Sequence, residues 1–194
     1  MKIEHKSRTG KIYYLHVTAL NGGARPRYHF SRNRSGTLAD TIPDGYEIYE
    51  NIGGQVFLRR KLPQVITDEE LASVNAALKR RPKGRFYLTE VKKHAIVIYE
   101  AEDRTEEYLK MAMPWIDKDR LREHAKESAS YQAVMRFTLI DPEKRLFTAE
   151  RYCFRGSVED WIAISMSSAP LAAHLKRFIK HLGEESFFEL YAWS

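Results

Sequence analysis

Three short segments rich in glycine, asparagine or proline each separate two stretches in which apolar and polar residues alternate. They are "NGGARP" at residues 21–26, "NIGG" at residues 51–54 and "DPEK" at residues 141–144. Asn-Gly and Gly-Gly pairs adopt the positive φ angles of tight turns, and proline suits the second position of a type I turn. Turns this short join antiparallel strands. The chain is therefore predicted to fold largely into antiparallel β-hairpins.

The stretches on either side of the first turn show the side-chain period of a strand. In "KIYYLHVT", residues 11–18, Leu15 and Val17 alternate with Tyr14 and His16. In "RYHFSRN", residues 27–33, the aromatic residues at positions 28 and 30 share the face that is expected to meet a core. Further hairpins are predicted over residues 45–61, over residues 85–103 with a turn near Lys93, and over residues 132–154.

Helical patterns lie between these hairpins. Over residues 67–80 the apolar period becomes that of a helix, and Thr67 with Glu70 predicts a capping box at its start. Residues 104–131 predict two helices divided by Pro114, and residues 169–182 predict a final helix that ends at Gly183. About four helices packed on antiparallel sheets make an α+β protein.

The pattern of elements also suggests a domain organisation. Residues 1–63 form a basic, β-rich N-terminal subdomain, and residues 64–84 form the capped helix and a linker that ends in the breaker sequence "RPKG". Residues 85–194 form an α+β C-terminal domain.

Composition excludes several classes of protein. A chain of 194 residues with 43% hydrophobic residues can bury a core, and it has neither an apolar run of membrane-spanning length nor the apolar segment of a secretory signal. Its single cysteine, Cys153, excludes an internal disulfide framework and a multi-cysteine zinc site. We therefore expect a cytoplasmic protein without a cofactor. Cys153 lies in a stretch with the alternation of a strand, and we expect its side chain to be buried in the core.

The net charge of +6 is confined to one part of the chain. Residues 1–63 carry 11 Lys and Arg against 5 Asp and Glu, whereas residues 64–194 carry 21 of each. A basic segment of this kind attracts polyanions whatever their sequence. The alternative is a basic sheet surface whose charge only keeps it solvated.

Aromatic and basic residues interleave in this segment, most densely in "RPRYHFSRNRSG" at residues 25–36. If the first two predicted strands pair across the turn at residues 21–26, their outward residues would share one face that binds a partner; these are Tyr14, His16, Arg27 and His29, with Arg32 at the edge. Single-stranded nucleic-acid modules use such faces, because rings stack on bases while cations contact phosphates. A protein-interaction module that contacts an acidic protein or a second copy of the chain is the alternative.

Enzymatic patterns are weaker. Asp44 after a proline and the Glu90-Val91-Lys92 triplet match the short motif of Mg²⁺-dependent nucleases, in which two carboxylates hold the ion and a lysine steadies the attacking water. Such short matches arise by chance in a charged chain. The two histidines of the final helix, His174 and His181, are seven residues apart without a carboxylate between them, so we expect no metal site there. A Mg²⁺-dependent phosphodiesterase remains a second alternative to a binding protein.

The first 70 residues carry a resemblance. The run "IPDGYEIYEN" followed by "QVFLRR" is its most specific part, together with "GKIYYLHVT" and "RPRYHFSR". These residues resemble the opening segment of a set of bacterial proteins catalogued as hypothetical. The resemblance implies a bacterial, cytosolic protein and implies no activity, cofactor or catalytic residue.

Overall fold

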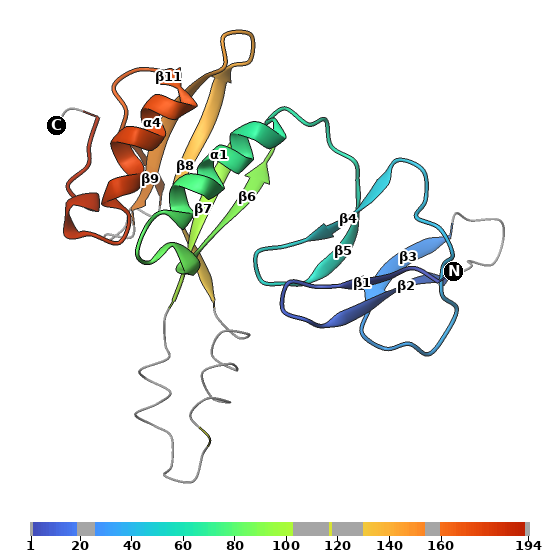
Figure 1. Cartoon of the computed structure of the whole chain (residues 1–194). Coiled ribbons are helices and arrows are strands. Elements are labelled where there is room, and N and C mark those ends of the chain that lie inside the picture. Colours follow the sequence, from blue (N-terminus) through green and yellow to red (C-terminus); the bar gives the residue numbers. More distant parts are fainter. Residues whose placement is uncertain (1, 19–25, 103–116, 118–129, 154–159, 193–194) are drawn as a thin grey trace. The chain divides into compact units, whose positions relative to one another are not determined.

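A computed structural model describes residues 2–18, 26–102, 117, 130–153 and 160–192. The chain divides into two compact units, Met1–Leu62 and Pro63–Ser194, which are described separately below (Figure 1). Each unit is built on antiparallel strand pairs, and the whole belongs to the α+β class. The helix predicted over residues 67–80 lies in the second unit.

The first unit contains two small sheets. One has the strand order β1-β2-β3, with β1 at Glu4–Lys6, β2 at Ile12–Thr18 and β3 at Arg27–Ser31. The other pairs β4, Tyr46–Glu50, with β5, Val56–Arg60. Strands β2 to β5 match the two predicted hairpins. The sequence analysis missed β1, because a strand of three residues, two of them charged, shows no alternation.

The core of the first unit is small. Leu15 of β2 is completely buried, and Val56 of β5 and Ala39 are nearly so. Ala39 belongs to a segment that continues the sheet beside β2, since its N–H donates to Leu15 O at 2.8 Å and its carbonyl accepts from Ile3 N at 3.0 Å. Strand β3 also lies against β5, so the inner faces of the two sheets meet.

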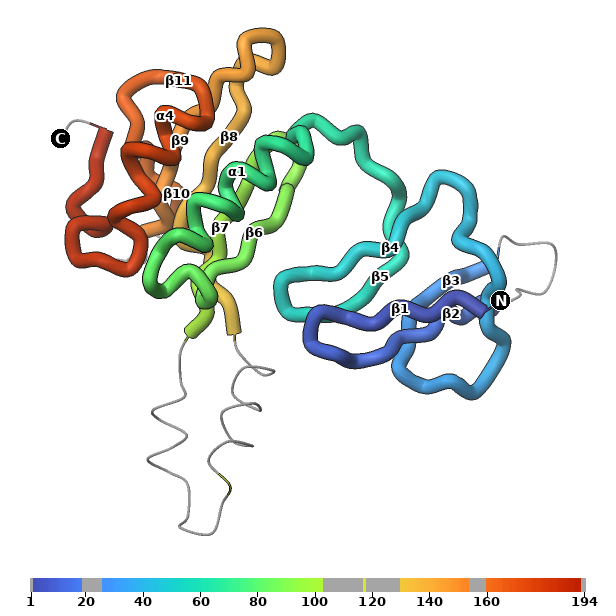
Figure 2. The backbone as a smooth tube through the Cα atoms, in the orientation of Figure 1, coloured from blue at the N-terminus to red at the C-terminus, as the bar shows by residue number. Residues whose placement is uncertain are grey.

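The second unit contains a six-stranded sheet in the order β10-β9-β8-β7-β6, with β11 pairing β9 beside β10 (Figure 2). The central strands are β7 at Ala95–Ala101, β8 at Tyr131–Asp141 and β9 at Leu146–Cys153. The outer strands are β6 at Tyr87–Lys92, β10 at Asp160–Ala163 and β11 at Ala169–Pro170. Lys93 has a φ of 54°, which fits the turn predicted near it.

Two α-helices of the expected four or so occur in the described residues, α1 at Asp68–Lys79 and α4 at Leu171–Phe178. The other two were predicted within residues 104–131, most of which lie outside the described residues. Thr67 and Glu70 form the predicted capping box at the start of α1. Single turns of 3-10 helix follow at η1, Gly84–Phe86, η2, Ile179–His181, and η3, Glu185–Phe187. Among the described residues, no helix is long and apolar enough to cross a membrane.

Both helices cover one face of the six-stranded sheet. Strand β9 shows why: its residues alternate strictly between buried and half-buried, with Phe147, Ala149 and Cys153 on the covered side. Val74 and Leu78 of α1 and Phe178 of α4 join the same hydrophobic cluster as Phe147. The predicted burial of Cys153 is therefore confirmed.

His174 of α4 is buried within this cluster. Its ring stacks between Phe137, at 6.3 Å between ring centroids, and Phe178, at 5.8 Å. Its Nε2 donates to the carbonyl of Phe147 at 2.6 Å, which fixes the neutral tautomer with the proton on Nε2. Burial, aided by the charge of Arg177, lowers the pKa of His174 below its usual value although the bond to Phe147 opposes the shift.

This lowered pKa makes the second unit less stable in acid. Below about pH 6.5 the unfolded chain takes up a proton at His174 more readily than the folded chain, so stability falls as the pH drops from that value toward the folded pKa. We expect His174→Gln to show a smaller decrease in melting temperature between about pH 7.5 and pH 5.5 than the wild-type protein. Thermal melts at the two pH values measure this, and an equal decrease in both proteins would contradict it. His181, whose pKa burial also lowers, is unchanged in both proteins.

Candidate nucleic-acid interface

The predicted binding residues of the first unit lie on adjacent strands in register. Strands β2 and β3 pair His16 with His29, Tyr14 with Ser31 and Thr18 with Arg27. Residues directly opposite each other in an antiparallel pair point to the same side of the sheet. The register therefore brings Tyr14, His16, Arg27 and His29 to one face, on the side away from Leu15.

The two histidines stack on each other but differ in exposure. Their ring centroids lie 5.1 Å apart with an angle of 17° between the planes. His29 is exposed, whereas only 8% of His16 is accessible and its Nε2 lies 2.8 Å from the carbonyl oxygen of Asn33. On the other side of β2, Leu38 bridges to His16. His16 therefore anchors the segment that follows β3, and His29 is the ring that solvent can reach.

That segment, the Arg32–Gly36 loop, is held by its own polar contacts. The N–H of Asn33 donates to Ser31 Oγ at 3.1 Å, and Asn33 Oδ1 accepts from the N–H of Ser35 at 2.9 Å. Arg32 and Arg34 on either side of Asn33 are exposed. The guanidinium carbon of Arg34 lies 5.8 Å from the centre of the Tyr14 ring, a cation–π distance. Sequence reasoning left Arg34 out of the site, although an Asn two residues before a Ser is a turn signal that could have placed it.

We call Tyr14, Arg27, His29 and Arg34, together with Arg32 of the loop at their edge, the β2–β3 outer face. Among the described residues, neither Arg27, Arg32 nor Arg34 forms an ion pair with a carboxylate. The acidic side chains of the unit are mostly engaged elsewhere, in the pairs Lys2–Asp40, Arg59–Glu47 and His5–Glu50. Glu4 stands across from Tyr14 on β1 and brings one negative charge to the same side of the sheet. The outer face keeps a positive excess.

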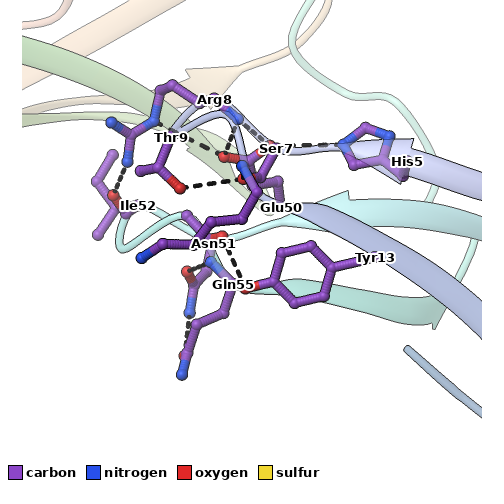
Figure 3. A network of polar contacts seen from close by, with 11 residues as sticks. His5, Ser7, Arg8, Thr9, Tyr13, Glu50, Asn51, Ile52 and Gln55 are labelled. Atoms are coloured by element: carbon purple, nitrogen blue, oxygen red, sulfur yellow. Dashed lines mark hydrogen bonds and ion pairs between the residues drawn. The ribbon is translucent and has the colours of Figure 1, made fainter. Parts of the chain in front are cut away.

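A polar network on the opposite side of the sheet holds the β4–β5 hairpin in place (Figure 3). The carboxylate of Glu50 accepts the backbone N–H of Arg8 at 2.9 and 3.1 Å, and His5 Nε2 lies 3.5 Å from it. The guanidinium of Arg8 donates to the carbonyl of Ile52. Because His5 and Tyr13 alternate with the outward residues of β1 and β2, their side chains lie on the inner face.

Gly54 lies where the β4–β5 turn contacts the β1–β2 turn, and this position requires glycine. Its φ is +77°, and a Cβ placed there would lie 2.9 Å from Cγ2 of Thr9. The turn of β4–β5 can therefore approach the turn of β1–β2 closely only with glycine at this position. Asn51 closes the same turn, since its Oδ1 accepts from the N–H of Gln55 at 2.9 Å.

The residues of the nuclease motif fall in different units. Asp44 is exposed in the turn before β4 in the first unit, whereas Glu90 and Lys92 lie on β6 in the second. Lys92 Nζ is 3.5 Å from the Glu90 carboxylate and 5.3 Å from the centre of the Tyr99 ring. The Tyr99 hydroxyl first, and then the charge of Glu90, raise the pKa of Lys92 above its usual value. Lys92 is thus a firmly charged partner of Glu90 and Tyr99.

The remaining candidate residues have structural roles. His181 Nδ1 lies 2.8 Å from the hydroxyl of Ser186. Arg151, which shares the covered face of β9 with Cys153, donates from Nε to the carbonyl of Leu190 at 2.9 Å. In the described part of the chain, no group of three or more His, Cys, Asp or Glu side chains is arranged to hold a metal ion.

Comparison with known proteins identifies no family for this chain. The chain matches no protein-family model, and neither a curated protein nor a solved structure matches it significantly. Its function is therefore argued from its own residues.

Proposed function

We propose that the first unit binds nucleic acid through the β2–β3 outer face. The observation that carries the proposal is the set of three exposed arginines, Arg27, Arg32 and Arg34, none of which pairs with a carboxylate in the described residues. Guanidinium groups bind phosphate in a planar, bidentate geometry and are less strongly hydrated than ammonium groups, so unpaired arginines on a sheet favour a phosphate backbone as ligand.

The rings of the same face favour a single strand. The ring of His29 is exposed, and its stacking on the His16 ring restricts its orientation. His29 therefore presents a flat aromatic surface to solvent. Tyr14 is half-buried beside it, with Arg34 over its ring. Unpaired bases stack on such rings while arginines contact the flanking phosphates. A duplex offers no base face for stacking on these rings, because its bases are stacked on one another.

The proposal predicts that removing the two loop arginines weakens binding. Arg32→Ala/Arg34→Ala is expected to lower the affinity for a labelled single-stranded oligonucleotide about fivefold or more, and to reduce the slope of log K against log salt by about 1.4, or about 0.7 for each lost phosphate contact. Fluorescence anisotropy titrations between about 50 and 200 mM salt measure both quantities.

The matched control removes two exposed cations from the second unit. Lys93→Asn/Lys144→Ala loses the same charge, and asparagine tolerates the left-handed backbone of Lys93. This control is expected to bind like the wild-type protein. Equal binding by the loop variant and the wild-type protein would refute the role of the face. Binding that is indifferent to salt, or binding only to an acidic protein, would favour the protein-interaction alternative.

A further inference from the structure

The second unit has no net charge, but five of its basic residues are clustered in one part of the chain. Between Glu70 and Glu90 the chain carries no carboxylate and five cations, Lys79, Arg80, Arg81, Lys83 and Arg85. They follow one another from the last turn of α1 through η1. Four of them are exposed, and Arg81 is half-buried.

Helices α1 and α4 are neighbours on the sheet (Figure 2), and the segment after α1 contacts the segment after η2. Arg81 Nη2 donates to the carbonyl of Leu182 at 3.3 Å and pairs with Glu184 at 2.9 Å. Lys180 and His181 of η2 therefore lie beside the basic segment. Burial first, and then the positive charges of Lys180 and Arg81, lower the pKa of His181.

We call Lys79, Arg80, Lys83, Arg85 and Lys180 the α1–α4 basic end. Basic residues at helix C-termini commonly offset the partial negative charge of the carbonyl end, about half an elementary charge for each helix. Two helix ends thus require about one positive charge. The basic end supplies five, and within the described residues none of them forms an ion pair with a carboxylate. The helix dipoles account for only a small part of the cluster.

We infer that the α1–α4 basic end is a second contact for nucleic-acid phosphates on this chain. The inference rests on the proposed function, because it takes the same ligand. The five residues of the basic end are all aliphatic cations, so we expect them to contact phosphates and to add affinity without base preference.

Two weak contacts on one chain reinforce each other. Residues 61–67, between β5 and α1, join the two units covalently. Where one strand is long enough to reach both contacts, the second binding event is intramolecular and raises the avidity without any further contact. This arrangement would make the full chain bind a long single strand more tightly than either contact alone could.

The test uses the full-length protein and removes charge beside η1. Lys83→Ala/Arg85→Ala is expected to weaken binding of a labelled single-stranded oligonucleotide about fivefold and to lower the salt slope by about 1.4. The control Lys93→Asn/Lys144→Ala removes two cations from the turns at the other end of the same sheet and is expected to bind like the wild-type protein. The charge-retaining variant Lys83→Arg/Arg85→Lys is also expected to bind normally.

The outcomes separate this inference from the proposed function. If Lys83→Ala/Arg85→Ala binds like the wild-type protein while Arg32→Ala/Arg34→Ala is weakened, the second contact is wrong and the first stands. If only the η1 variant is weakened, the contact on the first unit is wrong. A wild-type protein that binds no oligonucleotide at low salt overturns both, and a loss of binding in the charge-retaining variant would assign the effect to altered structure and overturn the second contact.

Discussion

Replacing Phe137 by alanine is expected to lower the free energy of unfolding of the second unit by about 3–5 kcal/mol. Phe137 lies on the central strand β8 and is completely buried. Its ring stacks on His174, and the pairing of β8 with both β7 and β9 leaves little freedom for the surrounding strands to close the cavity. The decrease in the free energy of unfolding therefore has two parts, the lost transfer free energy of the ring and the free energy of the cavity that remains.

Urea unfolding followed by circular dichroism measures this effect. The control is Ile140→Thr on the same strand, where 53% of the side chain is exposed and β-branching is retained. It is expected to change stability by no more than about 0.5 kcal/mol. Comparable stability of the Phe137 and Ile140 variants would contradict the position of Phe137 at the centre of the core.

The second large effect is expected at Gly84. A Cβ at this position would lie 2.2 Å from the carbonyl oxygen of Leu78 and 3.2 Å from Cα of Lys79, both of which are backbone atoms of α1. Backbone cannot move aside as the end of a flexible side chain can, so Gly84→Ala must shift the end of α1 away from η1. We expect a loss of about 2–3 kcal/mol, within the usual range for overpacking.

The neighbouring substitution Lys83→Ala is the control, because this side chain is exposed in the same turn. It is expected to unfold like the wild-type protein. Because Gly84 lies between two residues of the α1–α4 basic end, Gly84→Ala should also weaken oligonucleotide binding, although it removes no charge. Unfolding of Gly84→Ala at the wild-type denaturant concentration would show that η1 does not pack against α1 as described.

Local signals in the sequence predicted most of the described fold. Turn residues located the hairpins, and Thr67 with Glu70 located the start of α1, because both depend on contacts between residues close in the chain. Strand β1 escaped prediction since three residues carry too little periodicity. Two of the four predicted helices were assigned to residues 104–131, most of which lie outside the described residues.

The candidate site was predicted less completely. Strand alternation grouped Tyr14, His16, Arg27 and His29, since alternation and one hairpin turn determine a face. It could not indicate that the carbonyl of Asn33 contacts the His16 ring and that Gly36 lies beside it, because that depends on where the loop after β3 returns. The basic run from Lys79 to Arg85 is visible in the sequence, but its meeting with Lys180 depends on two helices that are distant in the chain packing on one sheet.

The position of β6 at the edge of the sheet indicates a role for Glu90 and Lys92 other than metal binding. This strand ends the six-stranded sheet, so within the described residues one row of its backbone N–H and C=O groups has no neighbouring strand. An uncharged edge of this kind is a template onto which a strand from another molecule can add, and lysine at an edge opposes such addition because its charge would have to be desolvated. We expect the charges at residues 90 and 92 to oppose intermolecular strand pairing at this edge.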